Sequence, residues 1–111
     1  MVMFRSSPFG GTARTRVLVA LQLLDESYPR ELARVLRTSL SGVQSALRGL
    51  EQDGLVAARS VGRTRVFCFN PRYFALRELR AYLARLCAIE PALEREVQNL
   101  RRRPRRTGKP L

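Results

Sequence analysis

The hydrophobic pattern first becomes regular between Thr12 and Leu24, where apolar residues recur with the spacing of a helix. They form three stripes around that helix, and only the side near Thr15 and Gln22 is left polar. A helix that is apolar nearly all round has to be covered on more than one side. We therefore expect a buried first helix that packs on its own core and also on a second element or a partner chain.

Two shorter helices are predicted next, each with a recognisable start signal. Pro29 suits the first position of a helix, because a proline lacks the N–H that would have no partner there. Ser39 is a favourable N-cap for the following helix, and Gly54 provides a left-handed stop after Asp53. Two helices joined by a few residues around Thr38 form a helix-turn-helix unit.

A β-hairpin is predicted after the third helix. Leu55–Ser60 and Thr64–Asn70 favour strands, and Gly62 between them can take a positive φ at the tip. Phe67 and Phe69 share one side of the second strand, which we expect to face the core. The basic side chains near the tip are Arg59, Arg63 and Arg65.

The next part of the sequence predicts a long helix over residues 73–100, whose leucines follow the alternating three- and four-residue spacing of a heptad seam. Pro91 inside this pattern removes a hydrogen bond and clashes with the preceding turn, at a cost of about 3 kcal/mol, so we expect a kink or a break there. The predicted fold class is mainly α with a small β-hairpin (α+β). Residues 12–72 form its main domain, between a flexible N-terminal arm, residues 1–11, and a disordered basic tail, residues 101–111.

The formal net charge of this 111-residue chain is +12, and Lys109 is its only lysine. Such a basic domain favours a polyanionic partner, with nucleic acid ahead of an anionic membrane. A GC-rich genome that favours arginine codons, together with a basic tail, is the alternative explanation. No apolar run approaches the roughly 20 residues that cross a bilayer, and residues 1–10 lack the apolar stretch of a signal peptide, so we expect a cytoplasmic protein.

The same composition argues against catalysis and metal binding. The sequence contains no histidine, which is the commonest general base and a frequent zinc ligand. Cys68 and Cys87 lie far apart among apolar or aromatic neighbours, and both are predicted to be small core residues rather than metal or redox groups. We therefore expect no enzymatic activity, no metal and no cofactor.

The succession of three helices, a hairpin and a further helix, with the stretches YPRELARVLRTSLSGVQSALRGLEQDGLV and VGRTRVFCFNP, resembles the winged helix-turn-helix domain of ArsR-like bacterial and archaeal transcription regulators. The resemblance implies that residues 39–53 are a recognition helix, that residues 55–70 are a wing, and that the protein binds DNA as a homodimer. Metal-sensing members carry a cysteine-rich motif, but PRELARVLR contains no cysteine, so metal sensing is not implied here. The positions that carry the likeness most specifically are Leu32, Ala33, Ser39, Val43, Leu47, Leu50, Gly54, Leu55 and Gly62.

One side of the predicted recognition helix is polar without the Glu and Lys pairs that usually solubilise a helix face. With Val43 on the buried side, the outward side chains are Ser41, Gln44, Ser45 and Arg48. Arginine can donate two hydrogen bonds to guanine and glutamine can pair with adenine, so these four residues are candidates for reading bases in a major groove, with Gln44 and Arg48 first. The alternative is an ordinary solvated helix face.

Other residues are candidates for contacts with DNA phosphates. The N-terminus of the third helix carries unpaired donors and partial positive charge, and the hairpin tip can grip the backbone or place an arginine in a minor groove. The full set is Arg30, Arg37, Ser39, Arg59, Arg63, Thr64 and Arg65. Gly42 and Gly49, on one side of the third helix, indicate that a neighbour comes close, either the second helix or the DNA backbone.

The apolar excess on the first and last helices predicts a homodimer. Its candidate interface residues are Val19, Leu23, Leu76, Leu79, Leu83 and Leu86. The alternative is that the leucine stripe lies across the first helix within one subunit. These features together predict a sequence-specific regulator that binds double-stranded DNA, a homodimeric repressor. The alternatives are a winged helix that binds another protein, such as the partner in a two-gene system, and a winged helix associated with RNA.

Overall fold

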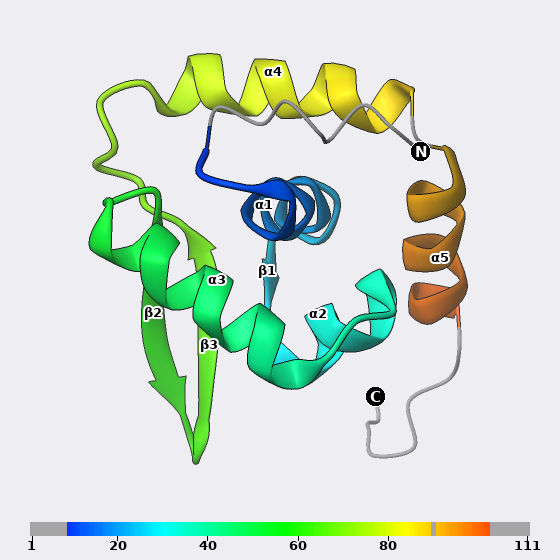
Figure 1. Cartoon of the computed structure of the whole chain (residues 1–111), viewed down its shortest axis with the longest axis horizontal. Coiled ribbons are helices and arrows are strands. Elements are labelled where there is room, and N and C mark those ends of the chain that lie inside the picture. The colour runs from blue at the N-terminus through cyan, green and yellow to red at the C-terminus, as the bar shows by residue number, and fades with distance from the viewer. Residues whose placement is uncertain (1–8, 90, 103–111) are drawn as a thin grey trace.

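Five helices and a three-stranded antiparallel sheet are formed by the residues that the computed structural model describes, 9–89 and 91–102. The mainly helical α+β class expected from the sequence is thus confirmed. Along the chain the elements are α1 Thr12–Leu24, β1 Glu26–Ser27, α2 Pro29–Leu36, α3 Leu40–Gln52, β2 Val56–Val61, β3 Thr64–Phe69, α4 Leu76–Ala88 and α5 Pro91–Arg102 (Figure 1). Within this part of the chain, none of the helices has the length and apolar character needed to cross a bilayer.

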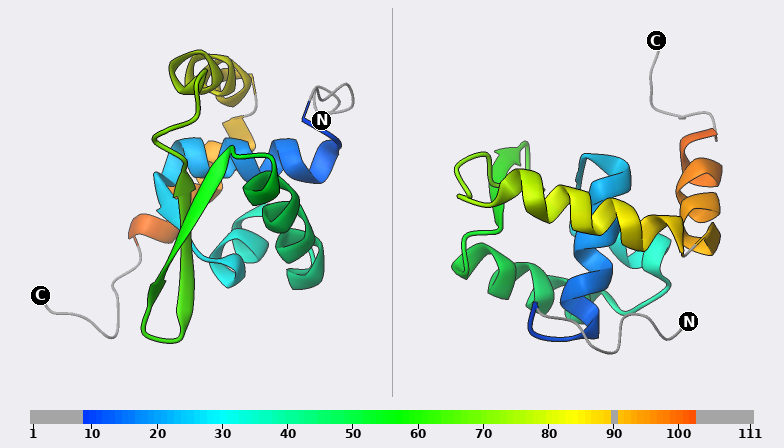
Figure 2. Two further views of the ribbon diagram at one scale, coloured as in Figure 1. Left: turned by 90° about the vertical axis from the view of Figure 1, so that its left-hand side faces the viewer. Right: turned by 90° about the horizontal axis from the view of Figure 1, so that it is seen from above.

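Helix α1 lies at the centre of the fold, with the other helices and the sheet around it (Figures 1 and 2). Val17, Leu18 and Leu21 are each at most 1 % exposed, and α1 packs against α2, α3, α4 and α5. The prediction that this helix is covered on several sides is confirmed, and its own chain supplies the cover. Thr15, expected on the polar side, is also buried, and its hydroxyl donates to the Gly11 carbonyl oxygen at 3.2 Å.

Local signals fix the ends of α2 and α3. α2 begins at Pro29, as predicted, and the turn that follows it contains Arg37 with φ +55°. Ser39 caps α3, because its hydroxyl oxygen accepts a hydrogen bond from the Gly42 N–H at 3.1 Å. Gly54, with φ +83°, takes the left-handed conformation expected after the end of α3. The predicted pair of helices therefore has the predicted boundaries to within a residue or two.

The sheet has the strand order β1–β3–β2, with both neighbours of β3 antiparallel to it. The hairpin β2–β3 turns at Gly62, whose φ is +63°, and Phe67 and Phe69 of β3 are 4 % and 5 % exposed. Both features were predicted. Strand β1, in which Glu26 pairs with Cys68, was not predicted, because two residues are too few to show an alternating pattern.

The long C-terminal helix is broken, as predicted, and α5 begins at Pro91. Its first half, α4, begins at Leu76 rather than at Tyr73. The leucine seam of α4 faces inward, because Leu79, Leu83 and Leu86 are only 6 %, 0 % and 8 % exposed and α4 packs on α1.

This burial corrects the predicted dimer interface. Val19 of α1 is 0 % exposed, and Leu23 and Leu76 are partly buried against the same core. The stripe lies across α1 within one subunit, which was the alternative, so these side chains have little or no surface left for a second copy. Residues 1–8 of the predicted arm and 103–111 of the predicted tail lie outside the described residues.

Candidate nucleic-acid interface

The polar side of α3 faces solvent along its length. Ser41, Gln44, Ser45 and Arg48 are all exposed, as their spacing predicts. The opposite side is buried in the core through Val43, Leu47 and Leu50, which are 1 %, 1 % and 0 % exposed. Because the apolar side is held on three consecutive turns, the polar side has a fixed orientation relative to the rest of the molecule.

A groove of about 520 Å³ runs between this side of α3 and the hairpin, and it is open at the surface. Gln44 and Arg48 line it from α3, whereas Ser41 and Ser45 lie beyond its edge. The start of α2, including Arg30, also lines it. The hairpin contributes Arg63, Thr64, Arg65 and Phe67. The fold therefore brings two of the four predicted base-reading residues together with four of the predicted phosphate contacts.

The groove is strongly basic, because four arginines and one glutamate line it. The glutamate, Glu51, accepts a hydrogen bond from Arg65 Nη2 at 3.0 Å. Arg65 also lies over the ring of Phe67, with its Cζ 5.1 Å from the ring centroid. Its guanidinium is thus held by an ion pair and a cation–π contact, so the groove has one fixed arginine on the hairpin side.

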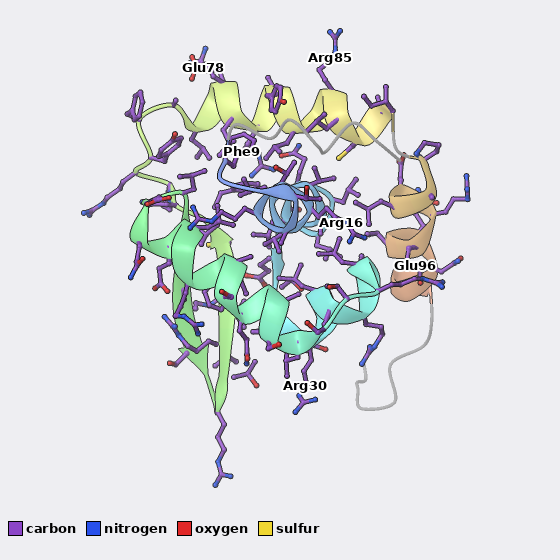
Figure 3. All side chains as sticks on the ribbon, in the orientation of Figure 1. Phe9, Arg16, Arg30, Glu78, Arg85 and Glu96 are labelled. Atoms are coloured by element: carbon purple, nitrogen blue, oxygen red, sulfur yellow. The ribbon has the colours of Figure 1, made fainter. Side chains whose placement is uncertain are left out.

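The other three arginines of the groove have free guanidinium groups. Among the described residues, Arg30, Arg48 and Arg63 form no ion pair and are exposed. Arg30 points away from the body of the molecule at the start of α2 (Figure 3). Arg48 projects from α3, and Arg63 follows Gly62 in the hairpin turn. These three guanidinium groups are therefore available to a polyanion, because none of them first has to break an ion pair with a carboxylate.

Two of the arginines predicted to contact phosphates form ion pairs outside the groove. Arg59 lies on the face of the sheet opposite Phe67, and its Nη1 donates to Glu26 at 2.9 Å, an interaction that raises the pKa of the guanidinium above its ordinary value. Arg37 donates to Glu96 of α5 at 3.1 Å, although its side chain is 77 % exposed. Neither residue lines the groove, and a carboxylate distant in sequence holds the guanidinium group of each.

The remaining predicted phosphate contact, Ser39, has a structural role. Its hydroxyl oxygen already accepts the Gly42 N–H, so one of the unpaired donors at the start of α3 is satisfied within the chain. The hydroxyl proton is still available to a phosphate oxygen. Ser39 is exposed but does not line the groove.

Arg14 of α1 borders the far side of α3, and no pattern in the sequence pointed to it directly. Its Nη1 donates to Asp53 Oδ2 at 2.8 Å, and a Cβ built on Gly49 would lie 2.6 Å from its Cζ. The neighbour indicated by Gly49 is therefore an arginine of the first helix, rather than the second helix or DNA. At Gly42 the nearest atom is the Ser39 hydroxyl oxygen, 3.0 Å from the position of a Cβ.

The cysteines take no part in the groove. Cys87 is 8 % exposed and lies against α1, with its Sγ 3.9 Å from the Val19 carbonyl oxygen, and burial raises the pKa of its thiol. Cys68 of β3 is partly buried, and both thiols are free. Within residues 9–89 and 91–102, no group of three Cys, Asp or Glu side chains is placed to hold a metal ion.

Comparison with models of protein families, with curated proteins and with solved structures finds no match to this chain. Function must therefore be inferred from the shape and charge of the groove and from the polar side of α3.

Proposed function

We propose that this chain is a sequence-specific regulator of transcription that binds double-stranded DNA as a homodimeric repressor, with α3 as its recognition helix and the β2–β3 hairpin as its wing. The observation that carries the proposal is the groove in which Gln44 and Arg48 of α3 face Arg63 and Arg65 of the hairpin. Hydrogen-bonding side chains on a rigid helix, beside cations on a neighbouring hairpin, suit a ligand that combines base edges with phosphates.

Helix α3 has the size and chemistry for a major groove. A helix with its side chains is about 10–12 Å across, and the major groove of B-DNA is about 12 Å wide. In such a position Arg48 donates two hydrogen bonds to guanine O6 and N7, and Gln44 pairs with the N6 and N7 atoms of adenine. Ser41 and Ser45, which lie outside the groove, contact either bases or phosphates on the open side of the helix.

The hairpin then lies beside the same duplex. Arg63 at its turn contacts the backbone or enters the adjacent minor groove, and Arg30 approaches a phosphate from the start of α2. These contacts hold the protein on the duplex, and they favour no base directly. Ser39 and the free N–H groups at the start of α3 offer a further phosphate contact.

The test is a selection of bound fragments from random duplex DNA, followed by affinity measurements on the selected sequence and on a scrambled one. Arg48→Ala is expected to cost about 1–3 kcal/mol on the selected sequence and little on the scrambled one. Arg63→Ala should weaken binding to both about equally. Arg77→Ala provides the control, because Arg77 is exposed on α4, outside the groove, and forms no ion pair among the described residues.

Failure to enrich any sequence, combined with equal affinity of all four proteins for DNA, would refute the proposal. If the groove variants instead lost binding to a protein partner, the interaction-module alternative would stand.

A further inference from the structure

We infer that Leu40, the first residue of α3, contacts the C5 methyl group of a thymine in the bound duplex. This inference rests on the proposed function and deepens it, because it adds a third base to the adenine assigned to Gln44 and the guanine assigned to Arg48. Among the groups that the four base pairs expose in the major groove, the thymine methyl group is the apolar one. An apolar side chain on the same side of α3 can therefore select thymine.

Leu40 differs from the other leucines of α3 in what covers it. Leu47 and Leu50 are 1 % and 0 % exposed and belong to the core. Leu40 is only partly buried, and it lines the groove together with the four arginines. Apolar surface that stays in contact with water gains free energy when a ligand covers it. Leu40 thus gives an otherwise basic groove a place that favours an apolar group of the ligand.

The spacing along α3 places Leu40 in line with the two proposed base-reading residues of the groove. Leu40, Gln44 and Arg48 follow one another at intervals of four residues, so each lies about 6 Å further along the helix axis. All three line the groove. Residues near the N-terminus of a recognition helix are those that contact base edges. In the proposed complex, Leu40 therefore meets a base on the side of Gln44 away from Arg48.

The surroundings of Leu40 suit the place that the methyl group takes in a duplex. In a T·A pair the C5 methyl group lies at the edge of the major groove, beside the backbone of its own strand. Leu40 directly follows Ser39, which is proposed to contact a phosphate, so its side chain lies near that edge. Tyr28 and Pro29 line the groove as well and are also partly buried. The apolar surface offered to the methyl group thus extends beyond a single side chain.

The start of α3 also lies where the rest of the proposed interface can reach the same duplex. It is on the same side of the molecule as the turn of the hairpin (Figure 1), and Arg30 points outward on that side (Figure 3). A cytosine at the position of the thymine would present its N4 amino group and no methyl group. Leucine cannot accept a hydrogen bond from that amino group, so the contact also disfavours cytosine.

Deoxyuridine tests the contact, because it differs from thymidine by the C5 methyl group alone. In the duplex that the wild type selects, each thymine of one half-site is replaced in turn by deoxyuridine, and affinity is measured by fluorescence anisotropy. One replacement, within two base pairs of the adenine preference that Gln44→Ala abolishes, should weaken binding about fourfold. Leu40→Ala should bind the thymine and deoxyuridine duplexes equally. Leu40→Met, which keeps a long apolar side chain, should retain most of the difference.

Ile89→Ala is the matched control, since it also removes apolar bulk at an accessible position. Ile89 is 52 % exposed, follows the end of α4 and does not line the groove. This variant should show the same fourfold difference between the two duplexes as the wild type. Circular dichroism melting shows that each variant is folded.

Equal affinity of the wild type for the thymine and deoxyuridine duplexes at every position would overturn the inference. A difference that persisted unchanged in Leu40→Ala would also overturn it, because the methyl group would then act through another residue or through the stiffness of the DNA. In both cases the proposed function would stand if Arg48→Ala still lost its preference for the selected sequence. A selection that enriched no sequence would end the proposed function and this inference together.

Discussion

Glu51 and Arg65 join α3 to β3 across the groove, with Arg65 Nη2 3.0 Å from the Glu51 carboxylate oxygen. Among the described residues, Glu51 is the one acid that lines the groove. Its charge repels phosphates, and it neutralises one of the four arginines around it. In the proposed complex, such an arrangement would lower affinity for DNA in general, so any duplex that binds tightly would have to compensate with specific contacts.

Replacing Glu51 by Gln should therefore strengthen DNA binding and reduce its selectivity. Removing the carboxylate ends the repulsion and frees Arg65 for a phosphate, which we expect to raise affinity for a scrambled duplex about three- to tenfold. Affinity for the preferred duplex should rise less, so the ratio between the two falls. Fluorescence anisotropy with both duplexes measures the ratio.

Glu94→Gln is the control for this substitution, because Glu94 is exposed on α5 and its replacement removes one negative charge away from the groove. If both variants changed the two affinities equally, the effect would come from net charge and not from the position of Glu51.

The inward seam of α4 makes a second prediction. Leu83 is 0 % exposed within the subunit, so Leu83→Ala should lower the free energy of unfolding by about 2–5 kcal/mol. The destabilisation should be the same at all protein concentrations, because it arises inside one chain. Urea unfolding at several concentrations measures it. A loss that disappeared at high protein concentration would place Leu83 in an interface, as the sequence first suggested.

Much of the fold follows from local signals in the sequence. Pro29, Ser39 and Gly54 act within one turn of the chain, so they fix the ends of α2 and α3 wherever those helices pack. Strand β1 has no such signal. It exists because the edge of β3 offers hydrogen bonds to residues 26 and 27, and pairing between segments so far apart depends on the finished fold.

The leucine seam shows a second limit of sequence reasoning. Heptad spacing correctly identified which side of α4 is apolar, but it holds no information on which helix covers that side. The break at Pro91 lets α5 turn back along α1 and α2, and this closes the core within one subunit.

Some features of the candidate site could likewise be predicted from the sequence, and others could not. Exposure of Gln44 and Arg48 follows from the buried side of α3 and could be predicted. The pairing of Arg59 with Glu26, and of Arg65 with Glu51, joins residues 33 and 14 positions apart and depends on how the sheet meets the helices. Arg37 pairs in the same way with Glu96, 59 positions away. Sequence reasoning therefore found the cations but not the carboxylates that hold three of them.

The contact between Arg14 and Gly49 gives a third prediction, which a double-mutant cycle can measure. Gly49→Ala alone should change stability little, because the helical preference for alanine is offset when the new Cβ displaces the Arg14 guanidinium from Asp53. In an Arg14→Ala background the same substitution should stabilise the protein by about 0.5–1 kcal/mol. Thermal or urea unfolding of the four proteins gives the coupling.

Equal effects of Gly49→Ala in both backgrounds would show that Arg14 does not restrict this position. Gly54→Ala is a useful comparison, since its φ of +83° should make alanine destabilising in either background.

Cys87 gives a prediction on pH. Burial raises the pKa of its thiol, followed by a smaller contribution from Glu94. A folded protein that holds this proton more tightly is fully stabilised below the ordinary thiol pKa of about 8.5 and loses that stability as pH rises through the higher folded value. Cys87→Ala has no such thiol and lacks this pH dependence. The difference in unfolding free energy between the wild type and Cys87→Ala should thus shrink above about pH 8.5.

The same burial should protect the thiol from reagents. A Cys68→Ser background removes the other free thiol, so that only Cys87 can react. In this background Cys87 should react with Ellman's reagent only slowly until urea unfolds the chain. Rapid labelling of the folded protein would mean that α4 opens readily from α1.

The salt dependence of the proposed DNA binding would separate the two kinds of groove arginine. Each phosphate that a cation neutralises contributes about 0.9 to the slope of log affinity against log salt concentration. Arg63→Ala should therefore reduce the slope by about 1 for each subunit bound. Arg48→Ala should leave the slope nearly unchanged and lower the affinity at every salt concentration, because the proposed partner of Arg48 is a base. Anisotropy titrations between low and moderate salt measure both quantities. If the two variants exchanged these effects, the hairpin would be reading bases and α3 would be holding the backbone, and the proposed roles would have to be reversed.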